Sequence, residues 1–333
     1  MIEELIIVTG GAGFIGSSFL EFLEHNHNSS IWIIDSLTYA SDESKIPDSK
    51  NIELIKQSIS EFGQMKKVFT RAKQEYKKIN VIHLAAESHV DRSIKASSLF
   101  IETNVLGTQN LLDLSSKVGV QRFVHVSTDE VYGEVINGES IESDYLKPSS
   151  TYAASKAASD LLVLAQVRTH GLDAVITRCT NNFGPNQAPE KFVPRVVNRL
   201  INNQPIPVYG NGEQVREWIS VSDHVNGIWS AFTTGKSGEI YNFGSGWRKT
   251  NLEIVSIIAE VLQVDPKIDF VKDRLGHDTR YAVNSNKSKE HLGWKIDDLT
   301  ENAFVDTVKK LANISLSTKG KKRFDEMESF YAN

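Results

Sequence analysis

Short apolar runs alternate with helical patterns along the first half of the chain. The runs that predict buried strands occupy residues 6–9, 31–34, 81–86 and 123–126. Between them, apolar or small side chains recur at helical spacing, and the positions that mark these faces are Phe19, Leu20 and Leu23, then Met65, Val68, Phe69, Ala72 and Tyr76, and then Ile101, Val105, Leu111, Leu112 and Ser115. Alternation of this kind predicts a parallel sheet that is covered by helices on both faces.

The pattern changes after Thr180, where the chain becomes rich in Asn, Pro, Gly and charged residues. We expect helices at 193–201 and 252–262 and a strand at 239–244, with no repeat or long linker between the two halves. The chain therefore predicts an α/β fold, a Rossmann-type doubly wound parallel sheet with a smaller, mixed α/β lobe. The expected sheet domain spans 1–180, with 219–246 returning to it, and the expected lobe comprises 181–218 and 247–333.

Composition narrows the partners that this protein can have. The 333 residues are 40% hydrophobic and carry a formal net charge of −5, which is enough apolar content for a large core and gives no basic footprint for nucleic acid or for an anionic membrane. Cys179 is the only cysteine, so the chain can form no intrachain disulfide and suits a reducing compartment. The N-terminus lacks the pattern of a signal peptide, and no stretch reaches the roughly 20 apolar residues of a membrane span. We expect a cytoplasmic protein without a metal site.

A glycine-rich turn follows the first predicted strand. Gly10, Gly13 and Gly16 would allow a tight turn, close approach of a pyrophosphate and close packing of the next helix on the sheet. The helix N-terminus would then present its free N–H groups to the phosphates. Asp35 ends the second strand 19 residues later, where a carboxylate can bind the adenosine ribose hydroxyls and repel a 2′-phosphate. This combination predicts binding of NAD rather than NADP.

Tyr152 and Lys156 are four residues apart in a sequence that favours a helix, so their side chains share one helix face. A nearby ammonium would lower the pKa of the tyrosine and make Tyr152 a base. By itself this spacing is common on solvated helix faces. Here it follows a strand that ends in Ser127 and Thr128, behind an N-terminal dinucleotide turn. Together these residues resemble the extended short-chain dehydrogenase/reductase family.

Asp129 and Glu130 follow Thr128 directly, at the carboxyl end of a predicted parallel strand, which is where ligands bind in such sheets. Two neighbouring carboxylates at this place can divide the work, with one protonated as an acid and the other ionised as a base. The alternative is an acidic turn that only caps the next segment.

Five stretches decide between these interpretations: HLAAESHVDRSI (83–94), STDEVYG (127–133), YAASK (152–156), NNFGPNQAPEKFVP (181–194) and DRLGHDTRY (273–281). Together they resemble the dTDP-glucose 4,6-dehydratases. The resemblance implies that Tyr152, supported by Thr128 and Lys156, accepts the proton of the sugar 4-hydroxyl while C4 is oxidised. It implies that Glu130 then removes the C5 proton, that Asp129 protonates the departing 6-hydroxyl, and that bound NAD is regenerated when C6 is reduced.

The resemblance also implies two sets of binding residues. The residues expected to hold NAD are Gly10, Gly13, Phe14, Ile15, Gly16, Asp35, Ser58, Ile59, Ala85, Tyr152 and Lys156. Those expected to hold the nucleotide sugar are Ser88, Asn181, Glu190, Lys191, Tyr209, Arg216, Asn251, Arg274, His277 and Tyr281. Among the latter, Tyr209 could instead be plain core and His277 a satisfied surface or loop histidine.

The chain departs from the family pattern at two places. Gln57-Ser58-Ile59 stands where the family has Gly-Asp-Ile, so the usual charged contact to adenine is missing, and segment 40–50 is also atypical and could form a lid or contact a dimer partner. The resemblance implies a homodimer, for which the helices at 101–117 and from Tyr152 onward are the candidates. Three alternatives stay open: 4,6-dehydration of UDP-glucose or of an N-acetylhexosamine nucleotide, another reaction on the same scaffold such as 4-epimerisation or decarboxylation, and an inactive NAD-binding protein.

Overall fold

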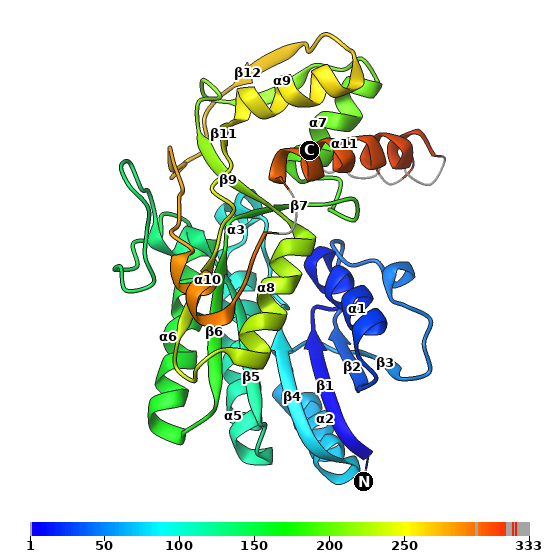
Figure 1. The fold of residues 1–333 in the computed structure, drawn as a ribbon, viewed down its shortest axis with the longest axis vertical. Coiled ribbons are helices and arrows are strands. Elements are labelled where there is room, and N and C mark those ends of the chain that lie inside the picture. Colours follow the sequence, from blue (N-terminus) through cyan, green and yellow to red (C-terminus); the bar gives the residue numbers. More distant parts are fainter. Residues whose placement is uncertain (1, 297–298, 318–321, 323, 325–333) are drawn as a thin grey trace.

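The computed structural model describes residues 2–296, 299–317, 322 and 324. Its centre is a seven-stranded sheet in which every neighbouring pair is parallel (Figure 1). In spatial order its strands are β10 (Ile240–Phe243), β6 (Ala174–Cys179), β5 (Arg122–Thr128), β4 (Tyr76–His83), β1 (Ile2–Thr9), β2 (Ser30–Asp35) and β3 (Ile52–Lys56). The strand order reverses between β1 and β4, so the carboxyl ends of these two strands flank the place where such folds bind ligands. The predicted Rossmann-type fold is confirmed.

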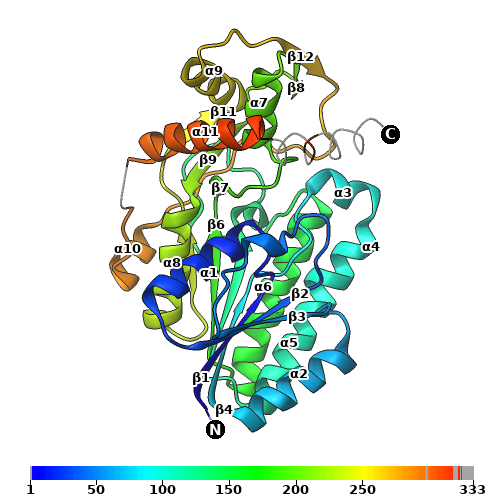
Figure 2. The ribbon, with the colours of Figure 1, turned by 90° about the vertical axis from the view of Figure 1, so that its right-hand side faces the viewer.

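Side chains alternate between two cores, one on each face of the sheet. Ile6 and Val8 of β1 point into one core, whereas Leu5 and Ile7 point into the other. The first face is covered by α1 (Phe14–Asn26), α8 (Val221–Thr234) and α10 (Asn286–Leu292). The opposite face is covered by α2 (Phe62–Glu75), α5 (Thr108–Val118) and α6 (Thr151–His170), as Figure 2 shows. Strands buried on both sides explain the continuous apolar runs in the sequence.

A second, smaller core lies beyond the carboxyl ends of the sheet strands (Figure 1). Phe183, Trp218 and Phe304 meet in it at ring-centroid distances of 5.1 to 6.5 Å. Its strands are β7 (Asn181–Phe183), β9 (Val215–Ser220) and β11 (Arg248–Thr250) in one sheet, and β8 (Ile206–Tyr209) and β12 (Ile268–Val271) in another. Its helices are α7 (Phe192–Ile201), α9 (Asn251–Leu262) and α11 (Thr300–Leu316).

Short helical segments connect these layers. They are η1 (Glu43–Lys45), α3 (Val90–Lys95), α4 (Ser97–Phe100), the π-helical η2 (Ile101–Gly107) and η3 (Asp129–Tyr132). None of the helices in the described part of the chain combines the length and the apolar character needed to cross a membrane.

Three details differ from the sequence prediction. Tyr76 does not lie on the helix face with Met65 but begins β4, where it packs edge-on against Trp32 at 5.5 Å between ring centroids. β4 ends at His83, so the predicted strand at 81–86 is too long at its carboxyl end. Ile101 is 48% exposed rather than buried, because the π-helical turn rotates the start of this helix relative to its later, buried face.

The expected lobe segment 247–333 also divides differently. α10 packs on α8 and β10, and Trp294 is buried in the core of the sheet unit, where its Nε1–H donates to the Asp223 carbonyl at 2.9 Å. Residues 286–294 therefore belong to the first core by their contacts. Residues 297–298, 318–321, 323 and 325–333 of this segment lie outside the described residues.

Candidate active site

The turn after β1 leaves no room for a side chain at Gly10 or Gly16. Gly10 has a φ of +72°, and a Cβ added there would lie 2.6 Å from the Ala85 nitrogen. A Cβ on Gly16 would lie 2.1 Å from the Gly10 carbonyl oxygen. α1 starts at Phe14 with Gly13 as its N-cap, and this glycine has no side chain to cap the first N–H groups. The turn thus brings bare backbone and a helix N-terminus to the edge of the sheet, as phosphate binding requires.

A cavity of about 490 Å³ lies over this turn and over the carboxyl ends of β1, β4 and β5. All eleven residues predicted to hold NAD line it: Gly10, Gly13, Phe14, Ile15, Gly16, Asp35, Ser58, Ile59, Ala85, Tyr152 and Lys156. The structure thus brings the whole predicted set to one continuous surface.

Asp35 is buried at the end of β2 and accepts three hydrogen bonds. Its Oδ2 accepts from the Ala12 amide at 2.9 Å, and its Oδ1 accepts from the Leu37 amide and the Ser41 hydroxyl, each at 2.8 Å. The carboxylate therefore ties the glycine-rich turn to the loop after β2, a structural contribution that the sequence did not reveal. Lys45 in the atypical segment 40–50 donates to the Asn186 carbonyl at 2.7 Å, which anchors this segment beside the cavity.

Tyr152 and Lys156 lie on the first turns of α6. The hydroxyl of Ser150 caps this helix by accepting from the Ala153 amide at 3.1 Å. Lys156 is 3% exposed, and its ammonium donates to the Val126 carbonyl at 2.8 Å. Burial lowers the pKa of Lys156 to about 8.

The pKa of Tyr152 differs from the sequence prediction. It lies well above the ordinary tyrosine value, because burial disfavours the charged phenolate and the Glu130 carboxylate adds electrostatic repulsion. Burial and Glu130 therefore outweigh the lowering that the Lys156 ammonium was expected to bring. A hydrogen bond with Thr128 opposes the rise. The phenolate needs further positive charge nearby before it can act as a base at neutral pH.

Asp129 and Glu130 lie in different surroundings. Asp129 is 3% exposed, its Oδ1 accepts from the Thr128 hydroxyl at 3.2 Å, and its Oδ2 has no hydrogen-bond partner in the described part of the chain. Burial, with Glu130 and Glu217 nearby, raises the pKa of Asp129 well above the ordinary value. Burial also raises the pKa of Glu130, although the cation of Arg216 opposes the rise. Asp129 is thus favoured as the protonated partner of the pair.

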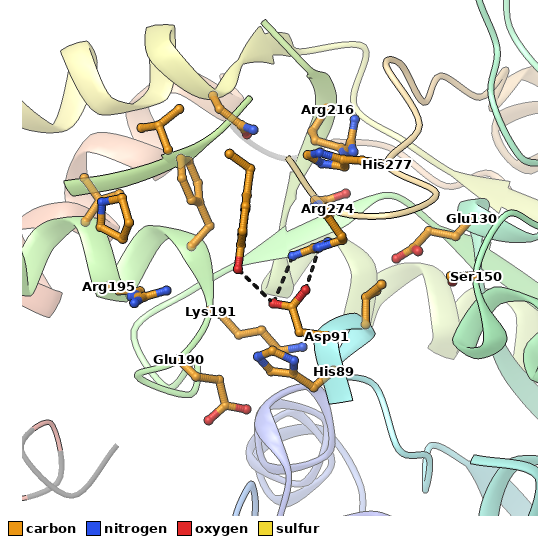
Figure 3. A pocket seen from close by; sticks show the side chains of 18 of the residues that line it. His89, Asp91, Glu130, Ser150, Glu190, Lys191, Arg195, Arg216, Arg274 and His277 are labelled. Carbon is orange, nitrogen blue, oxygen red and sulfur yellow. Dashed lines mark hydrogen bonds and ion pairs between the residues drawn. The ribbon is translucent and has the colours of Figure 1, made fainter. Parts of the chain in front are cut away.

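A second cavity of about 220 Å³ shares lining residues with the first and reaches residues of the smaller core. Figure 3 shows side chains that line it. All ten residues predicted to hold the nucleotide sugar line it: Ser88, Asn181, Glu190, Lys191, Tyr209, Arg216, Asn251, Arg274, His277 and Tyr281. Glu130 lines both cavities, so the carboxylate pair stands where the two sites meet.

Both predicted arginines are held in place by other side chains. The guanidinium of Arg216 stacks on Tyr281 at 4.4 Å from the ring centroid and donates to the Asp278 carbonyl at 2.9 Å. Arg274 lies 5.1 Å from the ring centroid of Tyr209. Such planar contacts orient a guanidinium for a bidentate anion.

Other predicted residues are engaged with neighbours as well. Lys191 donates to the Ser88 carbonyl at 3.2 Å. This hydrogen bond links the loop after β7 to the loop after β4. His277 lines the cavity, and its Nδ1 lies 2.7 Å from Asp273 Oδ1, so the ring is already satisfied by a neighbouring carboxylate.

The sequence analysis did not predict Asp91 as a residue of this site. Its carboxylate pairs with Arg274 and accepts a hydrogen bond from the Tyr209 hydroxyl at 3.4 Å (Figure 3). Asp91 lies in the stretch 83–94 that carries part of the resemblance, three residues after Ser88, and only its charge within an otherwise matched motif could have pointed to it. His89 and Arg195 line the same cavity and were not predicted either.

Comparison with known proteins gives the relationship. Residues 7–306 match the family described as GDP-mannose 4,6 dehydratase. The dTDP-glucose 4,6-dehydratase of Streptomyces antibioticus is 43% identical over 297 residues, which cover 87% of this chain and 87% of that protein. The dTDP-glucose 4,6-dehydratase 1 of Escherichia coli is 40% identical over 333 residues, which cover 91% of each chain. The chain belongs to the dTDP-glucose 4,6-dehydratase family.

Solved structures place this dehydratase family in a wider fold group. The dTDP-glucose 4,6-dehydratase DesIV of Streptomyces venezuelae, crystallised with NAD and dTDP, matches with a TM-score of 0.89 and 40% identity over 93% of this chain and 98% of that one. The UDP-glucose 4-epimerase of Thermus thermophilus, in complex with NAD, matches with a TM-score of 0.84 and 29% identity over 92% of this chain and 98% of that one. Since dehydratases and epimerases share the fold, the side chains of the site must decide the reaction.

Proposed function

We propose that this protein is an NAD-dependent dTDP-glucose 4,6-dehydratase, which converts dTDP-glucose to dTDP-4-keto-6-deoxyglucose. The observation that carries the proposal is the Asp129–Glu130 pair, which stands at the junction of the two cavities beside Thr128 and Tyr152. An epimerase has no use for an acid and a base at this position. The named relatives support the same reaction.

The first cavity suits NAD in three respects. Its glycine turn exposes backbone, α1 points an uncapped N-terminus into it, and Asp35 ends β2 at its edge. We assign the eleven lining residues predicted from the sequence to this cofactor, with Ser58 and Ile59 on the adenine side. Bound NAD supplies the hydride acceptor for C4 and, once reduced, the hydride donor for C6.

Tyr152 and Thr128 act on the sugar 4-hydroxyl in this proposal. Tyr152 receives the proton of this hydroxyl as C4 is oxidised, and Thr128 donates a hydrogen bond to the same oxygen. Because the surroundings raise the pKa of Tyr152, the base needs the ammonium of Lys156 one helical turn away and the positive charge of the oxidised nicotinamide.

Glu130 and Asp129 carry out the elimination of water. Oxidation at C4 acidifies the C5 proton, and Glu130 removes it. Asp129, whose pKa its surroundings raise, then gives its proton to the departing 6-hydroxyl, and water leaves. When hydride is returned to C6, Glu130 gives the proton that it removed back to C5. Arg216 lies among the cations that act on Glu130 and keep it available as a base.

The second cavity is assigned to the nucleotide diphosphate. Arg216 and Arg274 supply bidentate donors for phosphate oxygens, and Tyr209 offers a ring face for the pyrimidine. Thymine and uracil differ by one methyl group, which is worth only about 1 kcal/mol of discrimination, so UDP-glucose is the nearest competing substrate. UDP-N-acetylhexosamines are a further alternative with the same catalytic residues.

Steady-state turnover of dTDP-glucose, UDP-glucose and UDP-N-acetylglucosamine tests this assignment. The expected order of kcat/KM puts dTDP-glucose first, with each product lighter than its substrate by one water. A product of unchanged mass from UDP-glucose would identify a 4-epimerase instead.

Three further features belong to the proposal. Residues 1–180 and 219–246 form the NAD-binding part, and most of the remaining described chain forms the nucleotide-sugar lobe.

The protein acts as a homodimer through η2, α5 and α6, since Leu106 on η2 is 50% exposed and Leu161 on α6 is 58% exposed. It works in the cytoplasm, where NAD and nucleotide sugars are found.

A further inference from the structure

A row of buried ionisable side chains continues from Lys156 into the protein interior. His125 on β5, Asp160 on α6 and Arg178 on β6 are 0%, 0% and 2% exposed, and none of the three lines either cavity. The proposed mechanism gives them no task. Buried charges are costly, so a set of them beside a catalytic lysine needs a physical reason.

These side chains are joined by a continuous series of contacts. Lys156 Nζ lies 3.5 Å from His125 Nε2, and the same His125 Nε2 lies 3.4 Å from Asp160 Oδ1. On the far side, Arg178 Nε donates to Asp160 Oδ2 at 2.8 Å. Tyr152, Lys156 and Asp160 are each four residues apart, so α6 turns all three toward the same strands.

Asp160 is the anionic group of this row, and Lys156 and Arg178 share it. Burial and Lys156 lower the pKa of His125 to about 4, so its imidazole is neutral at physiological pH. The pKa of Asp160 lies below its ordinary value, because His125 and Arg178 favour the carboxylate over the opposing effect of burial. Asp160 is therefore ionised between two cations, Lys156 and Arg178.

The other groups that face Lys156 are uncharged. His83 on β4 is buried with a pKa well below its ordinary value, because burial disfavours its cation. Cys179 on β6 is a neutral thiol, since burial raises its pKa to about 12. The pKa of Tyr152 is raised, as described above. Among these groups, Asp160 provides the ionised carboxylate that favours the charged form of Lys156.

We propose that Asp160 is a positioning residue of the reaction: across the neutral imidazole of His125, its buried carboxylate keeps Lys156 in the ammonium form at the wall of the cofactor cavity. Arg178 limits this effect by sharing the same carboxylate. The inference rests on the proposed dehydratase function, in which that ammonium supports Tyr152. The competing explanation is a purely structural Asp160–Arg178 pair that fastens α6 to β6.

The variant Asp160→Asn separates the two explanations. Burial already lowers the pKa of Lys156 to about 8, and Asp160 opposes that effect. Loss of the carboxylate therefore moves this pKa further down, by about one pH unit or more, because the opposite charge that favours the ammonium is removed. Lys156 then loses its proton at a lower pH, and the alkaline limb of the kcat profile for dTDP-glucose moves in the same direction.

Two readouts are needed. The first is the pH profile of kcat, in which Asp160→Asn loses about tenfold at alkaline pH and much less at acidic pH, while Asp160→Glu restores the alkaline limb. The second is the titration of the Lys156 Cε signal in protein with ¹³C-labelled lysine, assigned with Lys156→Gln. This readout does not depend on turnover, so failure of the dehydratase function is recognised separately, as a wild-type protein that titrates but does not convert substrate.

Matched variants complete the design. Asp173→Asn breaks another arginine pair near the end of α6, with Arg122 at 3.2 Å, and is expected to leave both readouts unchanged. Arg178→Met should shift the Lys156 titration upward, and it carries the test if Asp160→Asn does not fold. A rate that falls by the same factor at every pH, or a Lys156 titration that moves in neither variant, would overturn the inference.

Discussion

Arg274 pairs with Asp91 across the second cavity. Its Nε lies 2.6 Å from Oδ1, and its Nη2 donates to Oδ2 at 3.2 Å. Asp91 belongs to α3 beside the sheet, whereas Arg274 belongs to the loop after β12, so the pair joins two walls of the cavity. The side chains are 23% and 24% exposed, which leaves room for a diphosphate to compete for the guanidinium.

Replacing Arg274 by glutamine should therefore weaken binding of dTDP. The loss of a charge-assisted, bidentate contact predicts an affinity about tenfold to a hundredfold lower, measured by isothermal titration calorimetry. Lys310→Gln removes an exposed cation on α11, away from both cavities, and serves as the control. Unchanged affinity in Arg274→Gln would remove this arginine from the diphosphate site.

Glu130→Gln should retain NAD and stop the reaction after C4 oxidation. Without the base, removal of the C5 proton slows by about 10²- to 10⁴-fold, and reduced cofactor accumulates, as seen by absorbance. Glu134→Gln is the matched control, because Glu134 follows the same turn but binds Thr279 outside both cavities. Water loss at the wild-type rate in Glu130→Gln would assign the base to another residue.

Asp129→Asn should make the protein more stable and less active. The folded state holds the pKa of Asp129 well above its ordinary value, so it keeps a proton that the unfolded chain releases as the pH rises past that value. Stability is thus lost on going from acidic to neutral pH, and an amide, which cannot ionise, avoids the loss. We expect a melting temperature about 1–3 °C higher at neutral pH.

The gain should disappear at a pH below the ordinary value of a carboxyl group, where Asp129 is protonated in both states. Elimination should slow, because an amide has no acidic proton to give. Asp265→Asn, at an exposed position after α9 and away from both cavities, is the control for a general effect of charge. A lower melting temperature at neutral pH would show that ionised Asp129 stabilises the fold.

Leu106→Glu should convert the proposed dimer to a monomer. A carboxylate on the exposed apolar surface of η2 and α6 has to be buried when two subunits meet, which is unfavourable without a partner. Light scattering after size-exclusion chromatography measures the mass. Leu316→Glu places the same charge on α11, where Leu316 is 57% exposed, and should leave the dimer intact. A monomeric wild-type protein, or a dimeric Leu106→Glu, contradicts the proposed interface.

Periodicity predicted the fold because both sheet faces are buried and each strand is short and apolar. It failed where tertiary packing overrides local pattern. Tyr76 fits the helical spacing of α2 but begins β4 because its ring packs against Trp32. β6 was not singled out, since Thr177 and Arg178 interrupt its apolar pattern, and only the structure shows that Arg178 is buried by its pair with Asp160.

Motif spacing predicted the cavity walls because the glycine turn, the strand ends and α6 are local features. Asp91 could not be found this way, as its partner Arg274 lies 183 residues away in the chain. The charge states of the site residues could not be predicted from the sequence either. Helical spacing places Lys156 near Tyr152, but the pKa of Tyr152 depends on burial and on Glu130, which no sequence pattern reports.

Conversion of dTDP-glucose that carries deuterium at C4 tests the central claim most directly. The account predicts a product lighter by one water, with the deuterium in the C6 methyl group and no net change in the absorbance of the cofactor. A product of unchanged mass that keeps deuterium at C4, or no conversion by protein that binds NAD, would contradict the assignment of this protein as a dTDP-glucose 4,6-dehydratase.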